Sequence, residues 1–159
     1  MKELFSKARP LEEYIAGAEE GIQRKIENLH KRAAKVQLSE DKSRYDKVLL
    51  ISETWCPDCL VLLAALKHLD QIIGPLEIKT LGRDEHMDLL ARYSVDGNSR
   101  IPLMLILDNE GSEVTYVSEV PDALRHVKKE EKKHRDYRAG KMMEALLNEL
   151  YSIFLGDKQ

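Results

Sequence analysis

The most constraining feature of this sequence is a pair of cysteines placed between two apolar segments. Val48-Leu49-Leu50-Ile51 is a short apolar run, typical of a strand buried on both faces of a sheet. Residues 60–73 are apolar nearly all round in their first turns, which predicts a helix lying against that sheet, and Gly74-Pro75 should end it. Cys56-Pro57-Asp58-Cys59 stands between the two segments, and Pro57 suits the first helical position because its missing N–H costs nothing there. The sequence therefore predicts two cysteines at a strand-to-helix junction.

Further strands and helices are expected around this junction. Short strands are predicted at residues 77–81, 103–107 and 113–117, and a turn of hairpin composition joins the last two. Helices are predicted at residues 84–93 with Asp84 as the cap, at 122–134 and at 142–155. This order predicts an α/β fold with a central mixed β-sheet flanked by helices.

The first 38 residues are predicted to be helical, because apolar residues recur in them at alternating steps of three and four. These positions are Leu11, Ile15, Ala18, Ile22, Ile26, Leu29, Ala33 and Val36. Gly17 and Gly21 weaken the pattern, so two shorter helices are an alternative. We expect this segment to pack on the body of the domain; the alternative is a docking or dimerising arm. Residues 1–159 are thus predicted to be one domain, with an N-terminal helical extension over 1–40 and a core with C-terminal helices over 45–155.

Composition excludes several classes of protein. The 159 residues carry 25 Lys+Arg and 28 Asp+Glu, a formal net charge of -3, which argues against nucleic-acid binding. No apolar run approaches the ~18 residues of a membrane span, and the amino terminus has no secretory signal pattern. Two cysteines are too few for a disulfide scaffold. We expect a soluble cytoplasmic protein without a nucleic-acid or membrane partner, whose thiols stay reduced unless they turn over.

The predicted junction favours redox chemistry. Cys56 would lie at the amino end of a helix, where unpaired N–H groups and the helix dipole favour its thiolate. Cys59, one turn further on, would be less exposed and close enough to form a disulfide with Cys56. Asp58 adds a like charge that disfavours the thiolate, so we expect a reducing dithiol rather than a strong oxidant.

Other uses of the cysteine pair are less well supported. A zinc site would need about two further ligands, and the sequence has no third cysteine. A c-type haem attachment needs a histidine after the second cysteine, where Leu60 stands. Two inert buried cysteines are the remaining alternative, which Trp55 and Pro57 disfavour. No metal or cofactor is therefore expected.

The motif Trp55-Cys56-Pro57-Asp58-Cys59, followed about 45 residues later by Ile101-Pro102 before an apolar strand, resembles the thioredoxin superfamily. The resemblance covers about Lys47 to Val117 plus a closing helix, and implies a thioredoxin-like fold. It implies that Pro102 is a cis-proline opposite the cysteines and that the backbone of Ile101 pairs with a substrate chain. Many thioredoxins place a buried carboxylate where this chain has Leu50. Glu53 or Asp58 would replace it, or Cys59 would lose its proton through water.

The function expected from the motif and the resemblance is thiol–disulfide oxidoreduction, with Cys56 and Cys59 as catalytic residues. Clients would be disulfide-containing proteins, and a separate reductase would supply the electrons. The residues expected to position the client or adjust the dithiol are Trp55, Pro57, Asp58, Ile101 and Pro102. The alternative is a redox-inactive adaptor that binds partners through its helical extension.

Two further features are assigned ordinary structural roles. His68 is expected to face solvent on the helix after the motif. The segment Arg125 to Lys141 has eight Lys/Arg against three Asp/Glu and is expected to be a solvated helix face.

Overall fold

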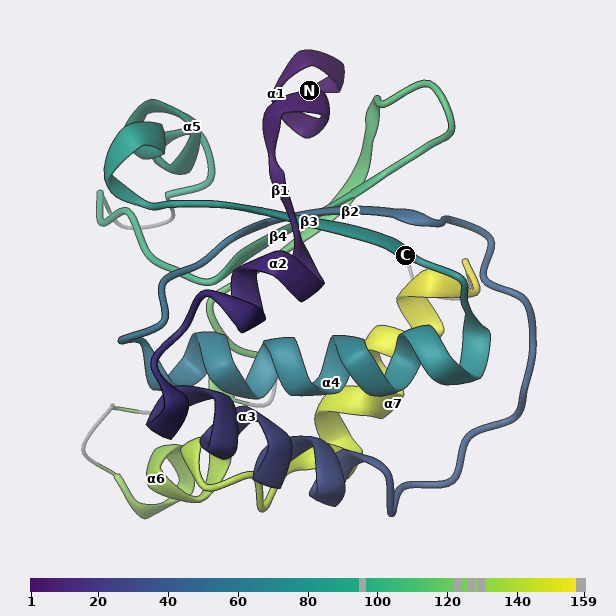
Figure 1. The fold of residues 1–159 in the computed structure, drawn as a ribbon, viewed down its shortest axis with the longest axis vertical. Helices are drawn as coiled ribbons and strands as arrows, with labels where there is room; N and C mark the ends of the chain where they lie inside the picture. The colour runs from purple at the N-terminus through teal and green to yellow at the C-terminus, as the bar shows by residue number, and fades with distance from the viewer. Residues whose placement is uncertain (95–96, 122–123, 126–127, 129–130, 157–159) are drawn as a thin grey trace.

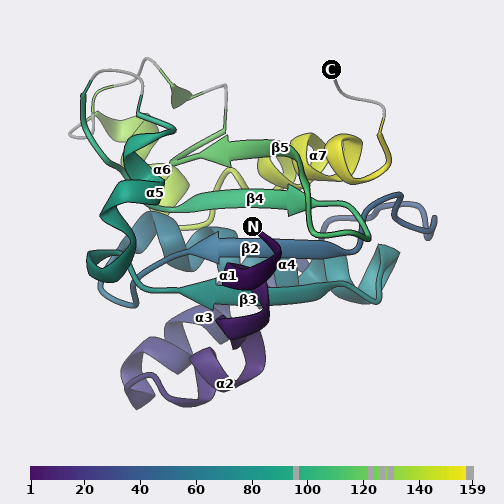
Figure 2. The same ribbon diagram turned by 90° about the horizontal axis from the view of Figure 1, so that it is seen from above.

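The computed structural model describes residues 1–94, 97–121, 124–125, 128 and 131–156. Within these residues, strands form one five-stranded sheet in the order β1-β3-β2-β4-β5. Figure 2 shows β3, β2, β4 and β5 side by side in this order. β2 pairs parallel with β3 and antiparallel with β4, while β1 and β5 pair antiparallel at the two edges. The strands are β1 (Arg9–Pro10), β2 (Lys47–Ile51), β3 (Glu77–Leu81), β4 (Leu103–Leu107) and β5 (Glu113–Ser118).

Helices cover both faces of the sheet (Figure 1). One face carries α2 (Leu11–Ala16), α3 (Glu20–Ala33), α4 (Pro57–Ile73), α6 (Lys132–Arg138) and α7 (Met143–Phe154). The other face carries α1 (Lys2–Lys7) and α5 (Met87–Ala91), which follows the short 3-10 helix η1 (Asp84–His86). None of the helices within the described ranges is long and apolar enough to cross a membrane.

The central strand β2 joins two apolar cores, because successive side chains of a strand point to opposite faces. Val48 and Leu50 belong to the core beneath α4, and Leu49 and Ile51 belong to the core beneath α1 and α5. All four side chains are fully buried. The prediction of a strand buried on both faces is therefore confirmed, and its carboxyl end leads directly into the cysteine motif.

The elements around the motif agree closely with the predictions. β3 and β4 have the predicted bounds, and β5 extends one residue beyond its predicted end. α4 begins at Pro57 and ends at Ile73, so the predicted stop at Gly74 is confirmed. The α/β fold with a mixed sheet between helices is confirmed as well.

The N-terminal segment is interrupted where a continuous helix was expected, and its last helix ends at Ala33 and not at residue 38. It forms three helices interrupted by β1, whose Arg9 and Pro10 pair with Thr80 and Lys79 of β3. Two residues carry no periodic signal, so this strand was not predictable from the pattern. Packing on the body of the domain is confirmed, since the buried positions of the stripe join the core around α4: Leu11, Ile26, Leu29 and Ala33.

Three local predictions are wrong. Asp84 lies inside η1 rather than before it, and its carboxylate accepts a hydrogen bond from Arg83. His68 is buried, 5% exposed, because the end of the N-terminal segment covers it and its Nε2 lies 3.2 Å from the Val36 carbonyl oxygen. The predicted break at residues 135–141 is instead largely helical, since α6 spans Lys132–Arg138. Residues 122–123, 126–127 and 129–130 of the predicted preceding helix lie outside the described residues.

Candidate active site

The two cysteines lie together at the amino end of α4. Cys56 is the N-cap residue, and its Sγ accepts a hydrogen bond from the backbone N–H of Cys59 at 3.4 Å. Both are free thiols. Cys56 is 8% exposed and Cys59 is completely buried. The outer sulfur is therefore the one that a partner molecule can approach.

The surroundings of Cys56 favour its thiolate. A hydrogen bond from the Cys59 side chain is the largest cause of a lowered Cys56 pKa, and backbone hydrogen bonds from Cys59 and Asp58 act in the same direction. Burial opposes this, and the charge of Asp58 also raises the pKa of Cys56, as the sequence predicted. The lowering influences are larger, so Cys56 has the character of a nucleophile.

Cys59 has the opposite character. Burial, followed by the hydrogen bond to Cys56, raises the pKa of the Cys59 thiol far above its usual range. A buried thiol that keeps its proton is unreactive until a neighbouring group helps to remove that proton. The pair thus combines an acidic outer thiol with a protonated inner one.

Two groups partly offset the raised pKa of Cys59. Hydrogen bonds from the Glu53 backbone and the Ser52 side chain lower the pKa of Cys59. Ser52 is fully buried, and its Oγ accepts a hydrogen bond from the Tyr14 hydroxyl of α2 at 3.3 Å. The Glu53 carboxylate instead accepts the Arg83 backbone N–H at 2.8 Å. The sequence analysis did not identify Ser52 as a site residue, although its position directly after an apolar strand could have indicated it. Nothing in the sequence indicated Tyr14.

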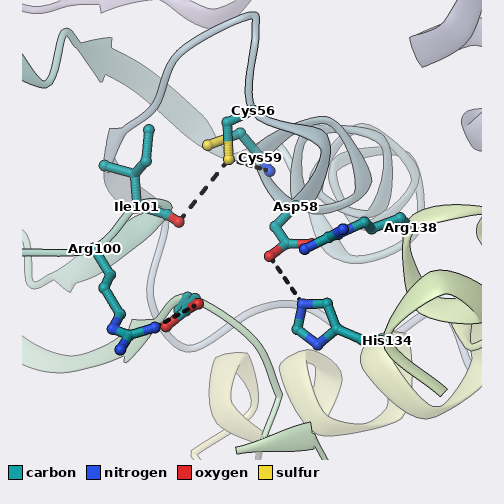
Figure 3. Close-up of polar contacts among 8 residues, drawn as sticks. Cys56, Asp58, Cys59, Arg100, Ile101, His134 and Arg138 are labelled. Carbon is teal, nitrogen blue, oxygen red and sulfur yellow. Dashed lines mark hydrogen bonds and ion pairs between the residues drawn. The ribbon is translucent and has the colours of Figure 1, made fainter. Parts of the chain in front are cut away.

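The Ile101-Pro102 segment faces the cysteines across the start of α4 (Figure 3). The Cys56 Sγ lies 4.0 Å from the Ile101 carbonyl oxygen, and the peptide bond between Ile101 and Pro102 is cis, as the resemblance implied. Both residues are buried. Arg100, just before them, forms an ion pair with Glu119 at 3.4 Å.

Trp55 and Pro57 form the exposed surface beside Cys56. Trp55 is 61% exposed and Pro57 is exposed as well. The guanidinium of Arg83 lies over the Trp55 ring, with 5.2 Å from Cζ to the ring centroid. A cation over an aromatic face attracts the ring electrostatically. This contact covers one face of the otherwise exposed Trp55 indole next to Cys56.

Asp58, expected to adjust the dithiol, is buried, unlike its exposed neighbours Trp55 and Pro57. Its side chain is only 6% exposed, and its carboxylate is directed away from the sulfurs (Figure 3). Oδ2 lies 3.4 Å from Nε2 of His134, and Oδ1 lies 3.4 Å from Nε of Arg138. Asp58 is therefore a buried group with both carboxylate oxygens held by α6.

His134 and Arg138 belong to the basic segment that was predicted to be a solvated face. Lys132, Lys133 and Arg135 of α6 do form an exposed face, but the opposite face is buried, with His134 2% and Tyr137 1% exposed. A sequence signal was present, since a histidine and an arginine four residues apart lie on one face of a helix. Nothing in the pattern, however, pointed that face toward Asp58.

This site has the groups that thiol–disulfide exchange requires. They are the two cysteine thiols, with the Ile101 carbonyl and the Trp55 indole beside them. A group of three or more metal-ligating His, Cys, Asp or Glu side chains does not occur within the described part of the chain.

Comparison with known proteins agrees with this geometry. A family model described as Thioredoxin matches residues 8–133, and this chain belongs to the thioredoxin family. The structure resembles a protein of unknown function from Pseudomonas aeruginosa, with a TM-score of 0.81 and 23% identity over 99% of this chain and 98% of that chain. It also resembles an HIV epitope-scaffold, with a TM-score of 0.82 and 22% identity over 98% of this chain and 97% of that chain. A search of the curated proteins found no match.

Proposed function

We propose that this protein is a thiol–disulfide oxidoreductase that reduces disulfide bonds in client proteins. The observation that carries the proposal is the unequal pair of thiols: the pKa of Cys56 is lowered at the surface and the pKa of Cys59 is raised in the interior. Membership of the thioredoxin family supports a redox role for a pair with this spacing.

In the first step, the Cys56 thiolate attacks one sulfur of a client disulfide. A bond forms between Cys56 and that sulfur, the client S–S bond breaks, and the departing client thiolate takes a proton from solvent. The Ile101 carbonyl, 4.0 Å from the attacking sulfur, lies beside the place where the client backbone would pair. Trp55 offers the exposed apolar contact for the client.

In the second step, Cys59 loses its proton and attacks the Cys56 sulfur. The Cys56–Cys59 disulfide forms, and the second client sulfur leaves as a thiolate that is then protonated. The client gains two electrons and two protons, and the protein is oxidised by the same amount. A separate reductase with a dithiol would restore the two thiols, so that no bound cofactor is needed.

The proposed direction of electron flow rests on Asp58, which acts against the larger influences that lower the pKa of Cys56. Its charge raises the pKa of Cys56 and so opposes the stabilisation of the reduced thiolate. A less stabilised reduced form makes the couple more reducing. We therefore propose a potential near the roughly −270 mV of thioredoxin rather than the roughly −120 mV of a strong oxidant, and a cytoplasmic role.

A trapping experiment tests the proposal. Cys59→Ser removes the second step, so client proteins should accumulate as mixed disulfides on Cys56 in a lysate. The matched control is Cys56→Ser, which removes the attacking sulfur and should trap none. Equal recovery of proteins by the two variants, or recovery by neither, would refute the mechanism.

The adaptor alternative predicts a different result. If the fold only docks partners, the double variant Cys56→Ser, Cys59→Ser should still bind them and should complement a deletion. The burial of Ile26 and Leu29 in the core argues against a free docking arm in α3.

A further inference from the structure

The C-terminal segment contributes a buried polar cluster directly behind the thiols. The cluster consists of Asp58 in the first turn of α4 and of His134 and Arg138 in α6. The side chains of Asp58 and His134 are 6% and 2% exposed, and that of Arg138 is 32% exposed. Within the described residues, the His134 Nδ1 is buried without a hydrogen-bond partner.

A buried carboxylate needs compensation, because removing a charge from water is unfavourable unless the charge is paired. Arg138 provides a permanent positive charge at 3.4 Å from Oδ1, and the His134 Nε2 lies at 3.4 Å from Oδ2. The two contacts bind both carboxylate oxygens from one side. They also turn the carboxylate toward α6 and away from the sulfurs (Figure 3).

The position of Asp58 makes this cluster relevant to the chemistry. Asp58 lies between the two cysteines in sequence, and its charge opposes ionisation of Cys56. How strongly it does so depends on where the carboxylate points and on how much of its charge is offset. Both properties are set by residues that lie more than seventy positions away in the sequence.

We propose that His134 and Arg138 are positioning residues that hold the Asp58 carboxylate away from the thiols, with Arg138 offsetting its charge, and so set how readily Cys56 forms its thiolate. The effect matters for catalysis only if the protein has the proposed function. His134 faces Asp58 across the helix interface, and Arg138 and Tyr137 accompany it on α6. The group that titrates in the experiment below is Cys56 itself.

The test measures the rate at which iodoacetamide alkylates Cys56 as a function of pH, with mass spectrometry to confirm the modified residue. Arg138→Met should move the midpoint to higher pH by on the order of half a unit, which lowers the rate below the midpoint about threefold. Asp58→Asn should move the midpoint to lower pH. Lys132→Met is the matched control, since it removes a charge from an exposed position of the same helix and should leave the midpoint unchanged.

Two further variants separate a specific role from a structural one. Arg138→Lys keeps the charge and should restore most of the wild-type midpoint. In the Asp58→Asn background, Arg138→Met should produce a much smaller shift, because the group that it positions no longer carries a charge. A shift of the same size in both backgrounds would show a direct effect of Arg138 on Cys56 and would overturn the proposal.

His134→Gln is the second single variant, and its fold is checked by circular dichroism because the site is buried. It should raise the midpoint as Arg138→Met does. If folded Arg138→Met and His134→Gln both keep the wild-type midpoint, the proposal is wrong. Alkylation requires no client, so this result stands even if the protein reduces no protein disulfide.

Discussion

Replacing Ser52 with alanine should slow the attack of Cys59 on the mixed disulfide and leave the attack of Cys56 on the client unchanged. Ser52 is fully buried directly after β2, and its side-chain hydrogen bond lowers the pKa of Cys59. The chain has Leu50 where a carboxylate would otherwise stand, so this hydroxyl is a group that can stabilise the Cys59 thiolate as it forms. Its own position is held by the hydrogen bond from Tyr14.

The size of the effect follows from the loss of one hydrogen bond to a charged group. Such a bond contributes about 1.5–3 kcal/mol, which corresponds to a rise of about one to two units in the pKa of Cys59. Each unit lowers the thiolate population about tenfold. The more basic thiolate is also about threefold more nucleophilic per unit, because the Brønsted coefficient for this reaction is ~0.4–0.5. The rate of the second step should therefore fall by about three- to tenfold.

The two steps can be separated with an aromatic disulfide whose released thiolate is coloured. The first equivalent of colour reports the attack by Cys56, and the second reports the attack by Cys59. Ser52→Ala should slow only the second phase, Tyr14→Phe should slow it less, and Ser6→Ala, a change at an exposed serine of α1, should slow neither. A second phase in Ser52→Ala that stays within about twofold of wild type would refute the reasoning, given the smallest effect worked out above.

Three further predictions concern the core, the thiols and the exposed indole. Ile26→Ala should lower the free energy of unfolding, measured in urea, by about 2–5 kcal/mol because Ile26 is buried. Lys25→Ala is the control at an exposed position of the same helix, and it should change this free energy by less than ~0.5 kcal/mol. Equal effects of the two changes would mean that α3 is not part of the core. Cys59→Ala removes the largest influence that lowers the pKa of Cys56, so the midpoint of Cys56 alkylation by iodoacetamide should move to higher pH, and an unchanged midpoint would contradict this assignment. Trp55→Ala should reduce turnover of a protein disulfide several-fold and leave turnover of a small aromatic disulfide nearly unchanged, since the indole is 61% exposed. Equal losses for both substrates would instead indicate a role in the chemistry.

The elements that the sequence predicted well are those whose signals are local. β2 and β4 are short apolar runs whose side chains would be buried in almost any sheet, and β3 alternates buried with more exposed side chains. Pro57 and Gly74 bracket α4 for reasons that apply to any helix. The cis peptide bond at Pro102 was expected only from the resemblance to the thioredoxin superfamily, and the structure contains it.

The features that escaped prediction depend on contacts between distant segments. His68 follows a helical pattern that suits an exposed position, and it is buried only because the N-terminal segment folds over it. The sequence showed that the segment around His134 and Arg138 is basic, but not which part of the fold these two side chains contact. Their meaning depends on the approach of α6 to Asp58, a contact across 76 and 80 residues of sequence. The fold was thus largely predictable, whereas the contacts of His134 and Arg138 with Asp58 were not.

The two-residue strand β1 has a consequence for the solubility of the whole sheet. An uncovered strand edge is a template on which another chain can pair and begin to aggregate. Arg9 and Pro10 occupy that position along β3, at Thr80 and Lys79, and the proline has no N–H to offer to a further strand. The chain thereby closes one side of its own sheet against self-association, and loss of residues 1–10 would open it.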